Sequence, residues 1–289
     1  MAFDPFLYLA FGLGLLAGWI VRPDSPWVGR ATLVSVVVLV GLLGASLNEV
    51  PASALVLEIP VALGFTLLIL GLTLGTFFLL LRLKPIAPRP PDPRDRHERF
   101  PFSAALITAL VGGYFLGHWV ALPTALGIQG ALYALLALVG FGLQLRTRGL
   151  GEVWLPLTAA IVGAVLGAMA FAFVAQVPVG ISLSASMAFG FYSLAGPLVA
   201  ARAGAVLGLL AFLTNFLRED LTMILSPVLG RRLHGEGLVA MGGATAMDTT
   251  LYFVTRYGDR DAGSLAIASG LVLTVVATLV VPAALTLPR

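Results

Sequence analysis

The stretches LTNFLREDLTMILS (residues 213–226) and GGATAMDTT (residues 242–250) place three carboxylates, Glu219, Asp220 and Asp248, among apolar and small residues. The chain of 289 residues is 59% hydrophobic and 11% charged, whereas soluble domains carry about 25% charged residues. A charged side chain near the centre of a bilayer costs roughly 2.5–3.5 kcal/mol on insertion scales, so acids in such segments usually serve transport or proton relay. The two stretches therefore indicate an integral membrane protein with a functional acidic site.

Apolar runs long enough to cross a bilayer recur along the chain and predict an all-α integral membrane protein with eight transmembrane helices. The predicted spans are 6–22, 27–47, 60–83, 102–120, 126–146, 153–176, 203–229 and 263–285. The segment KPIAPRPPDPRDRHERF (residues 84–100) contains five prolines and mixed charges, and predicts a loop at a membrane face. We expect a single transport domain over 1–289, with three helices in 1–83 and the others in 101–289.

Basic residues set the expected orientation, because cytoplasmic loops of membrane proteins are enriched in lysine and arginine. Their cluster around 84–100 places this linker inside and the N-terminus outside. If 182–201 crossed the membrane fully, Arg231 and Arg232 would face outside, against this bias. The conflict disappears if 182–201 and 237–256 are re-entrant hairpins that enter from opposite faces, which also leaves the C-terminus outside.

Opposed hairpins are typical of transporters built from inverted repeats, whose ligand sites lie between broken helices near the bilayer midplane. Backbone at that depth needs protein or a water-filled cavity to satisfy its polar groups. The small and polar residues of both stretches fit this requirement. A shift of 54 residues superposes three identical pairs, Met187 on Met241 among them, which is weak support for inverted repeats.

One polar face is predicted on the helix that carries two of the acids. Glu219 lies about midway along 203–229, too deep for its carboxylate to reach water at either end. Asn215 and Glu219 follow one face of this helix, which we expect to line the bundle interior or a cavity. Arg218 and Asp220 point elsewhere, and Arg218 is a possible charge partner of an acid. A purely structural ion pair is the alternative interpretation, but one arginine cannot neutralise three carboxylates.

Asp248 lies in the middle of the second predicted hairpin, beside the hydroxyl groups of Thr245 and Thr249. It could serve as the N-cap of a half-helix, as an ion ligand, or as both. If Asp248 and Glu219 face one cavity, they form an anionic site that suits a cation. Acids in such sites also act as proton relays.

The first hairpin and one helix end contribute further candidates. In GFYSLAGP (residues 190–197), Tyr192 and Ser193 lie beside interrupted backbone, whereas Gln144 either lines an inner vestibule or makes an interhelical contact. The chain has no cysteine and no cluster of histidines and acids with metal-ligand spacing, so we expect neither a disulfide nor a metal site. No phosphate loop occurs, and no cofactor is expected.

The expected partners follow from surface composition. Basic residues fall at helix ends rather than on one soluble face, so membrane lipid is expected as a partner and nucleic acid is not. Glycines spaced four residues apart allow close helix packing, either within the chain or across the interface of a homodimer. These pairs are Gly14/Gly18, Gly71/Gly75, Gly163/Gly167 and Gly204/Gly208.

Several motifs together resemble the lysine exporter LysO family of bacterial inner-membrane proteins. They are GLQLRTRG (142–149), GFYSLAG (190–196), NFLRE (215–219) followed by SP and RR at 226–232, and GGATAMD (242–248). The resemblance implies eight spans with both termini outside, export of L-lysine and its analogue thialysine, and a pair of intramembrane acids at Glu219 and Asp248. This chain departs from the family pattern NDLARE, because its TNFLRE has Asn215 in place of an acid, while Asp220 adds one.

The expected function is therefore secondary active export of L-lysine across the bacterial inner membrane, with protons as the coupling ion. Moving one positive charge outward against 100 mV costs about 2.3 kcal/mol, which proton antiport can supply. One alternative is a sodium-coupled carrier of another small amino acid or a carboxylate, and another is a passive channel. A third is an intramembrane enzyme that uses Glu219 and Asp248 as acid and base, although the GxGD signature of such proteases is missing.

Overall fold

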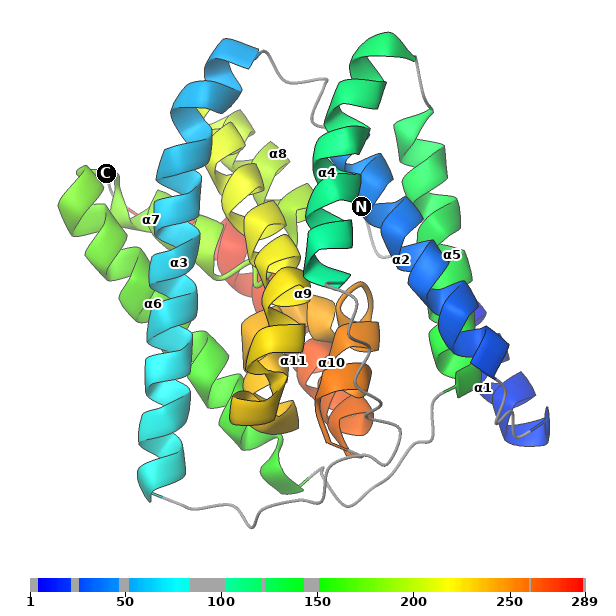
Figure 1. The fold of residues 1–289 in the computed structure, drawn as a ribbon. Coiled ribbons are helices and arrows are strands. Elements are labelled where there is room, and N and C mark those ends of the chain that lie inside the picture. Colours follow the sequence, from blue (N-terminus) through cyan, green and yellow to red (C-terminus); the bar gives the residue numbers. More distant parts are fainter. Residues whose placement is uncertain are drawn as a thin grey trace. The chain divides into compact units, whose positions relative to one another are not determined.

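The computed structural model describes residues 5–21, 26–46, 52–83, 102–120, 123–142, 151–259 and 261–287, and in these ranges it consists of helices without strands. The predicted linker 84–100 and Gln144 lie outside the described residues. Two compact units form (Figure 1). The first contains α1 (Pro5–Val21), α2 (Pro26–Ser46), α4 (Phe102–Trp119) and α5 (Thr124–Gly142). The second contains α3 (Ala52–Leu83), α6 (Trp154–Ala175) and all later helices.

Glycines bring helices together within both units. In the first unit, Gly14 and Gly18 of α1 lie directly against the backbone of α5 at Ala137 and Phe141. In the second, Gly163 and Gly167 of α6 lie against Thr73 and Ile69 of α3. The prediction that these two glycine pairs pack within the chain is confirmed.

The other two glycine pairs behave differently. Gly204 has a positive φ of 92° at the junction of α8 and α9, so it is a turn residue, whereas its partner Gly208 lies directly against Ala200 of α8, as predicted for packing within the chain. A Cβ atom built at Gly71 or Gly75 of α3 would have no atom of another described element within 4 Å. A homodimer interface on this part of α3 stays a prediction.

The second unit contains two helical hairpins, each with a break at its tip. The first hairpin (residues 179–203) consists of α7 (Val179–Ser186), a break, and α8 (Tyr192–Ala203). The second hairpin (residues 235–257) begins after His234, whose φ of 55° and ψ of −172° interrupt α9 (Ala205–Gly242). It continues through the 3-10 helix η3 (Gly243–Met247) to α10 (Leu251–Tyr257).

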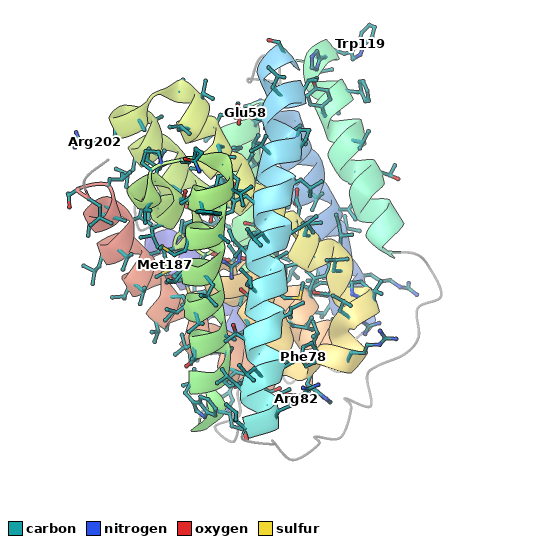
Figure 2. All side chains as sticks on the ribbon, turned by 90° about the vertical axis from the view of Figure 1, so that its left-hand side faces the viewer. Glu58, Phe78, Arg82, Trp119, Met187 and Arg202 are labelled. Carbon is teal, nitrogen blue, oxygen red and sulfur yellow. The ribbon has the colours of Figure 1, made fainter. Side chains whose placement is uncertain are left out.

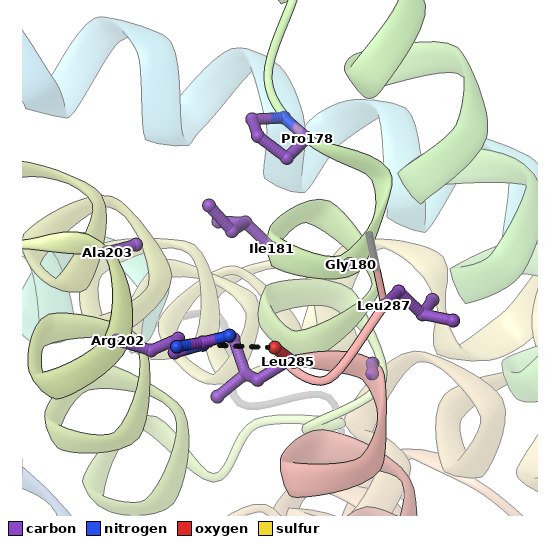
Figure 3. A pocket seen from close by; sticks show the side chains of 8 residues that line it. Pro178, Gly180, Ile181, Arg202, Ala203, Leu285 and Leu287 are labelled. Carbon is purple, nitrogen blue, oxygen red and sulfur yellow. Dashed lines mark hydrogen bonds between the residues drawn. The ribbon is translucent and has the colours of Figure 1, made fainter. Parts of the chain in front are cut away.

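Both ends of the first hairpin lie at the C-terminal end of α11 (Ala262–Ala284). Pro178 and Gly180 lie at the start of α7, and Arg202 belongs to the last turn of α8. All three line one pocket together with Leu285, which follows α11 (Figure 3). Within this pocket, Arg202 Nε donates a hydrogen bond of 3.4 Å to the Leu285 carbonyl. The hairpin thus returns to the side from which it starts.

Both ends of the second hairpin lie at the N-terminal end of α11. Gly235 and Gly258, at its start and just beyond its end, both lie against Ala262, the first residue of α11. The two hairpins consequently approach from opposite ends of α11, and the second meets its middle where Gly270 contacts Met247. Figure 2 likewise shows Met187, in the first break, at mid-height between Glu58 and Arg82 of α3. Re-entry of these hairpins into a membrane stays a prediction.

Each predicted span overlaps a described helix, although the end of the fifth span, 143–146, lies outside the described residues, and two boundaries differ clearly from the prediction. α3 begins at Ala52 rather than residue 60, so Glu58 and Pro60 are inside the helix. The helix that begins at Ala205 continues to the interruption at His234 rather than ending at 229, and the rest of α9, up to Gly242, is the first piece of the second hairpin. By length and apolar composition, the described residues contain three helical segments able to cross a membrane, Val56–Leu83, Trp154–Ala175 and Ala262–Ala284.

Candidate functional site

The tips of the two hairpins touch each other. The Ala244 amide donates a hydrogen bond of 3.0 Å to the Phe189 carbonyl, which joins the two breaks through their main chains. A Cβ atom at Gly243 would lie 2.8 Å from the same carbonyl oxygen, and one at Gly190 would lie 2.6 Å from Thr245 Cγ2. Both glycines also have left-handed φ values, 66° and 105°, so the close approach and the backbone conformation both require glycine here.

Asn215 of α9 holds the first break in place. Its Oδ1 accepts a hydrogen bond of 2.8 Å from the Gly190 amide, and its Nδ2 donates one of 2.7 Å to the Ala185 carbonyl. Nδ2 also donates to the Ala211 carbonyl of its own helix. Since Ala185 and Gly190 flank the break, the buried amide of Asn215 replaces backbone hydrogen bonds that the interrupted helix cannot make.

Arg218, one turn further along α9, holds the second break. Its Nε and Nη2 donate hydrogen bonds of 3.0 and 3.1 Å to the carbonyls of Met241 and Ala240, at the C-terminal end of the helical piece that precedes η3. Its guanidinium carbon lies 5.7 Å from the centre of the Phe189 ring, in the first break. The sequence suggested an acid as the partner of Arg218. The hydrogen-bond partners of its guanidinium group are instead carbonyl oxygens.

The acids of α9 are deeply buried. Glu219 is 2% exposed and Asp220 is 3% exposed. Glu219 Oε1 and both carboxylate oxygens of Asp220 have no hydrogen-bond partner among the described residues. Buried acidic oxygens without partners are costly unless a proton or a cation accompanies them.

Asp248 lies within electrostatic range of Glu219 beside the second break. The two carboxyl groups are close enough for their charges to interact, and Asp220 also acts on Glu219. Asp248 Oδ1 accepts hydrogen bonds from the Thr249 amide at 2.6 Å and the Thr249 hydroxyl at 3.3 Å, and this hydroxyl also interacts with Glu219. The structure therefore brings the two predicted acids together, with Thr249 between them. Their binding of a ligand stays a prediction.

Asp248 does not act as a regular helix cap. Thr250 occupies the N-cap position of α10, and no side chain caps this helix. The Asp248 carboxylate instead accepts a hydrogen bond from the amide of the next residue, Thr249.

Tyr192, the first residue of α8, lies near all three acids. Its ring packs edge-on against Phe212 and Phe216 of α9, with centroid distances of 5.3 and 5.9 Å. Its phenol group is within electrostatic range of Glu219, Asp248 and Asp220. The structure therefore places Tyr192 at the acidic site, as the sequence analysis expected.

The remaining predicted residues have other surroundings. The Thr245 hydroxyl donates to the Gly242 carbonyl, and the Thr245 carbonyl accepts from the Asp248 and Thr250 amides, so Thr245 stabilises the break. Ser193 belongs to α8, but its side chain is outside the described part of the structure. Within the described ranges, no group of three or more His, Cys, Asp or Glu side chains has an arrangement suited to a metal ion.

Sequence reasoning missed the part that Arg218 plays in anchoring the second break. Spacing offers one signal, since Asn215 and Arg218 are three residues apart and thus neighbours on one helix surface. The partners of Arg218 are main-chain carbonyls, however, and these have no signature in a sequence.

Comparison with known proteins supplies independent information. The model of the family described as "Lysine exporter LysO" matches residues 105–285, more than half of the chain. A Haemophilus influenzae protein named as a candidate lysine exporter is 29% identical over 178 residues, which cover 58% of this chain and 89% of that protein. "Lysine exporter LysO" of Escherichia coli is 26% identical over 207 residues, covering 65% of this chain and 69% of the relative. No solved structure matches the chain.

Proposed function

The chain belongs to the lysine exporter LysO family, and from this premise we propose that it exports L-lysine across the bacterial inner membrane by proton antiport. Family membership makes the protein an integral membrane transporter of the inner membrane rather than an enzyme, and an exporter of an amino acid. L-lysine as its own substrate, thialysine as a further one, and protons as the coupling ion belong to the proposal.

The observation that supports the proposal is that Glu219 and Asp248 lie within electrostatic range of each other, beside the second helix break. Two acids that share a buried site repel each other, and a proton or an ammonium group relieves this repulsion. Lysine carries two ammonium groups at neutral pH. The acids can therefore exchange protons for the ammonium groups of the substrate, so that release of one accompanies binding of the other.

The two hairpins supply the route to this site. We take them as re-entrant from opposite faces of the membrane, with 84–100 in the cytoplasm and both termini outside. Their breaks then lie near the midplane, where broken helices of secondary transporters form their sites. The driving force is the proton gradient, because export of a cation works against a membrane potential that is negative inside.

Transport by purified protein in lipid vesicles tests the proposal. Vesicles loaded with labelled lysine should release it faster when the outside is made acidic, and Glu219→Gln and Asp248→Asn should each reduce this efflux at least about tenfold. Ser226→Ala is a matched control on the same helix, because the Ser226 hydroxyl bonds to the Thr222 carbonyl within α9.

Three outcomes would contradict the proposal. Efflux at the wild-type rate from both acid variants would exclude their exchange role. Stimulation by a sodium gradient but not by a proton gradient would favour the sodium-coupled carrier. Absence of saturable counterflow would favour a channel.

A further inference from the structure

We propose that Arg218 binds the carboxylate of the transported amino acid, so that the site has separate cationic and anionic halves. This inference rests on the proposed function, because it assumes that the substrate is an amino acid. It assigns to Arg218 a role in selecting substrates, beyond its anchoring of the second break.

The guanidinium group of Arg218 is oriented so that one edge is used and another is free. Nε and Nη2 form the edge that donates to the carbonyls of Met241 and Ala240. Nη1 is buried and has no hydrogen-bond partner among the described residues. The free end of the guanidinium, Nη1 together with the second hydrogen of Nη2, is a pair of parallel donors that matches the two oxygens of a carboxylate.

The charge of Arg218 is also uncompensated in the described structure. The side chain is 1% exposed. It donates hydrogen bonds to two carbonyl oxygens and lies over the Phe189 ring, and none of these partners is an acid. Removal of a guanidinium ion from water costs several kcal/mol unless it is paired. An anionic group at Nη1 would complete its coordination.

The side chains of Arg218 and Glu219 point to different sides of α9. Glu219 follows Arg218 directly, and successive residues of a helix point about 100° apart because a turn contains 3.6 residues. The groups that act electrostatically on Glu219 are Asp248 and Asp220. A ligand that reaches both parts of the site must therefore carry opposite charges at a distance from each other, as an extended lysine does with its side-chain ammonium and its carboxylate.

Several backbone amides at the two breaks cannot bind a carboxylate, because they already donate hydrogen bonds within the protein. At the start of α8, the amides of Tyr192, Leu194 and Ala195 all donate to carbonyls of the preceding break. In the second break, the Ala244 amide is bonded to Phe189 and the Asp248 amide to Thr245. These engaged amides leave the Arg218 guanidinium as the charged donor at the crossing of the breaks.

A comparison of L-lysine with 1,5-diaminopentane, the same diamine without the carboxylate, tests this role. In vesicles containing the full-length protein, unlabelled lysine should compete with labelled lysine about ten- to a hundredfold better than the diamine, as expected for a hydrogen-bonded charge pair. Arg218→Gln keeps a donor for the Met241 carbonyl but removes the charge, and should abolish this preference while the diamine still binds. Arg202→Gln is the matched control, because Arg202 lies in the pocket at the far end of the first hairpin.

The outcomes separate this inference from the proposed function. If lysine and the diamine lose affinity equally in Arg218→Gln, the arginine is only a structural anchor and the inference is wrong. If the variant fails to insert, the wild-type protein still decides, because equal competition by lysine, lysine amide and the diamine would also exclude a carboxylate contact. Absence of any lysine transport by the wild type would instead overturn the proposed function.

Discussion

Asn215 shows how one side chain supports a helix break. Its side-chain amide both accepts a hydrogen bond from the Gly190 amide and donates one to the Ala185 carbonyl. An ionised carboxylate can accept but cannot donate. The asparagine therefore fits a first break that is fixed in one conformation, while Asp220 maintains the number of acids on α9.

Replacement of Asn215 by leucine should destabilise the protein. The change leaves the Gly190 amide and the Ala185 carbonyl without their partner, at a cost of about 1–3 kcal/mol for each buried group. Thermal unfolding in detergent measures the effect, and Asn215→Asp should cost less than Asn215→Leu because the acceptor remains. Thr222→Val is the control, since the Thr222 hydroxyl only adds a bond to the Arg218 carbonyl in its own helix. Equal stability of Asn215→Leu and the control would contradict the anchoring role.

At the level of helices, the sequence predicted where the two hairpins lie better than it predicted their internal structure. Small residues and the charge conflict at Arg231 and Arg232 pointed to interruptions near 182–201 and 237–256, and the structure has breaks in both stretches. The extent of α9 and the start of α3 were missed, because apolarity marks a membrane-spanning core but not the helical turns that continue beyond it. α3 also continues through Pro60, the first residue of the predicted span.

Contact between the two breaks makes a prediction about their glycines. Gly243→Ala would place a methyl group against the Phe189 carbonyl. The alanine would also have to adopt the positive φ of Gly243, which costs about 1–2 kcal/mol for a residue with a side chain. We expect this variant to lose both thermal stability and lysine transport. Gly71→Ala is the control, because its site has no neighbouring atom and alanine favours helix by about 0.5–1 kcal/mol. If Gly243→Ala were as stable as Gly71→Ala, the close crossing of the breaks would be wrong.

At the scale of the whole molecule, composition alone identified an α-helical membrane protein, and the order of its motifs identified the family. The acidic site was predictable because acids are rare in apolar segments. The predicted membrane orientation rests on the distribution of arginines, because cytoplasmic loops of membrane proteins are enriched in basic residues.

Single cysteines can determine that orientation, because the natural chain contains none. Arg202 and Arg232 are both exposed, near the end of the first hairpin and just before the second. A membrane-impermeant maleimide applied to intact cells should label Arg202→Cys but not Arg232→Cys, and inside-out vesicles should give the reverse pattern. Labelling of both from one side would contradict the opposed arrangement.

The main-chain bond between Ala244 and Phe189 has a mechanical consequence. Together with Asn215 and Arg218, it fastens both hairpin tips to α9, so separation of the tips would break several hydrogen bonds at once. Alternating access is then expected to keep α7 to α10 as one rigid body and to concentrate the movement at its boundary with α3, α6 and α11. A carrier of this kind changes the side to which its cargo is exposed without taking its binding site apart.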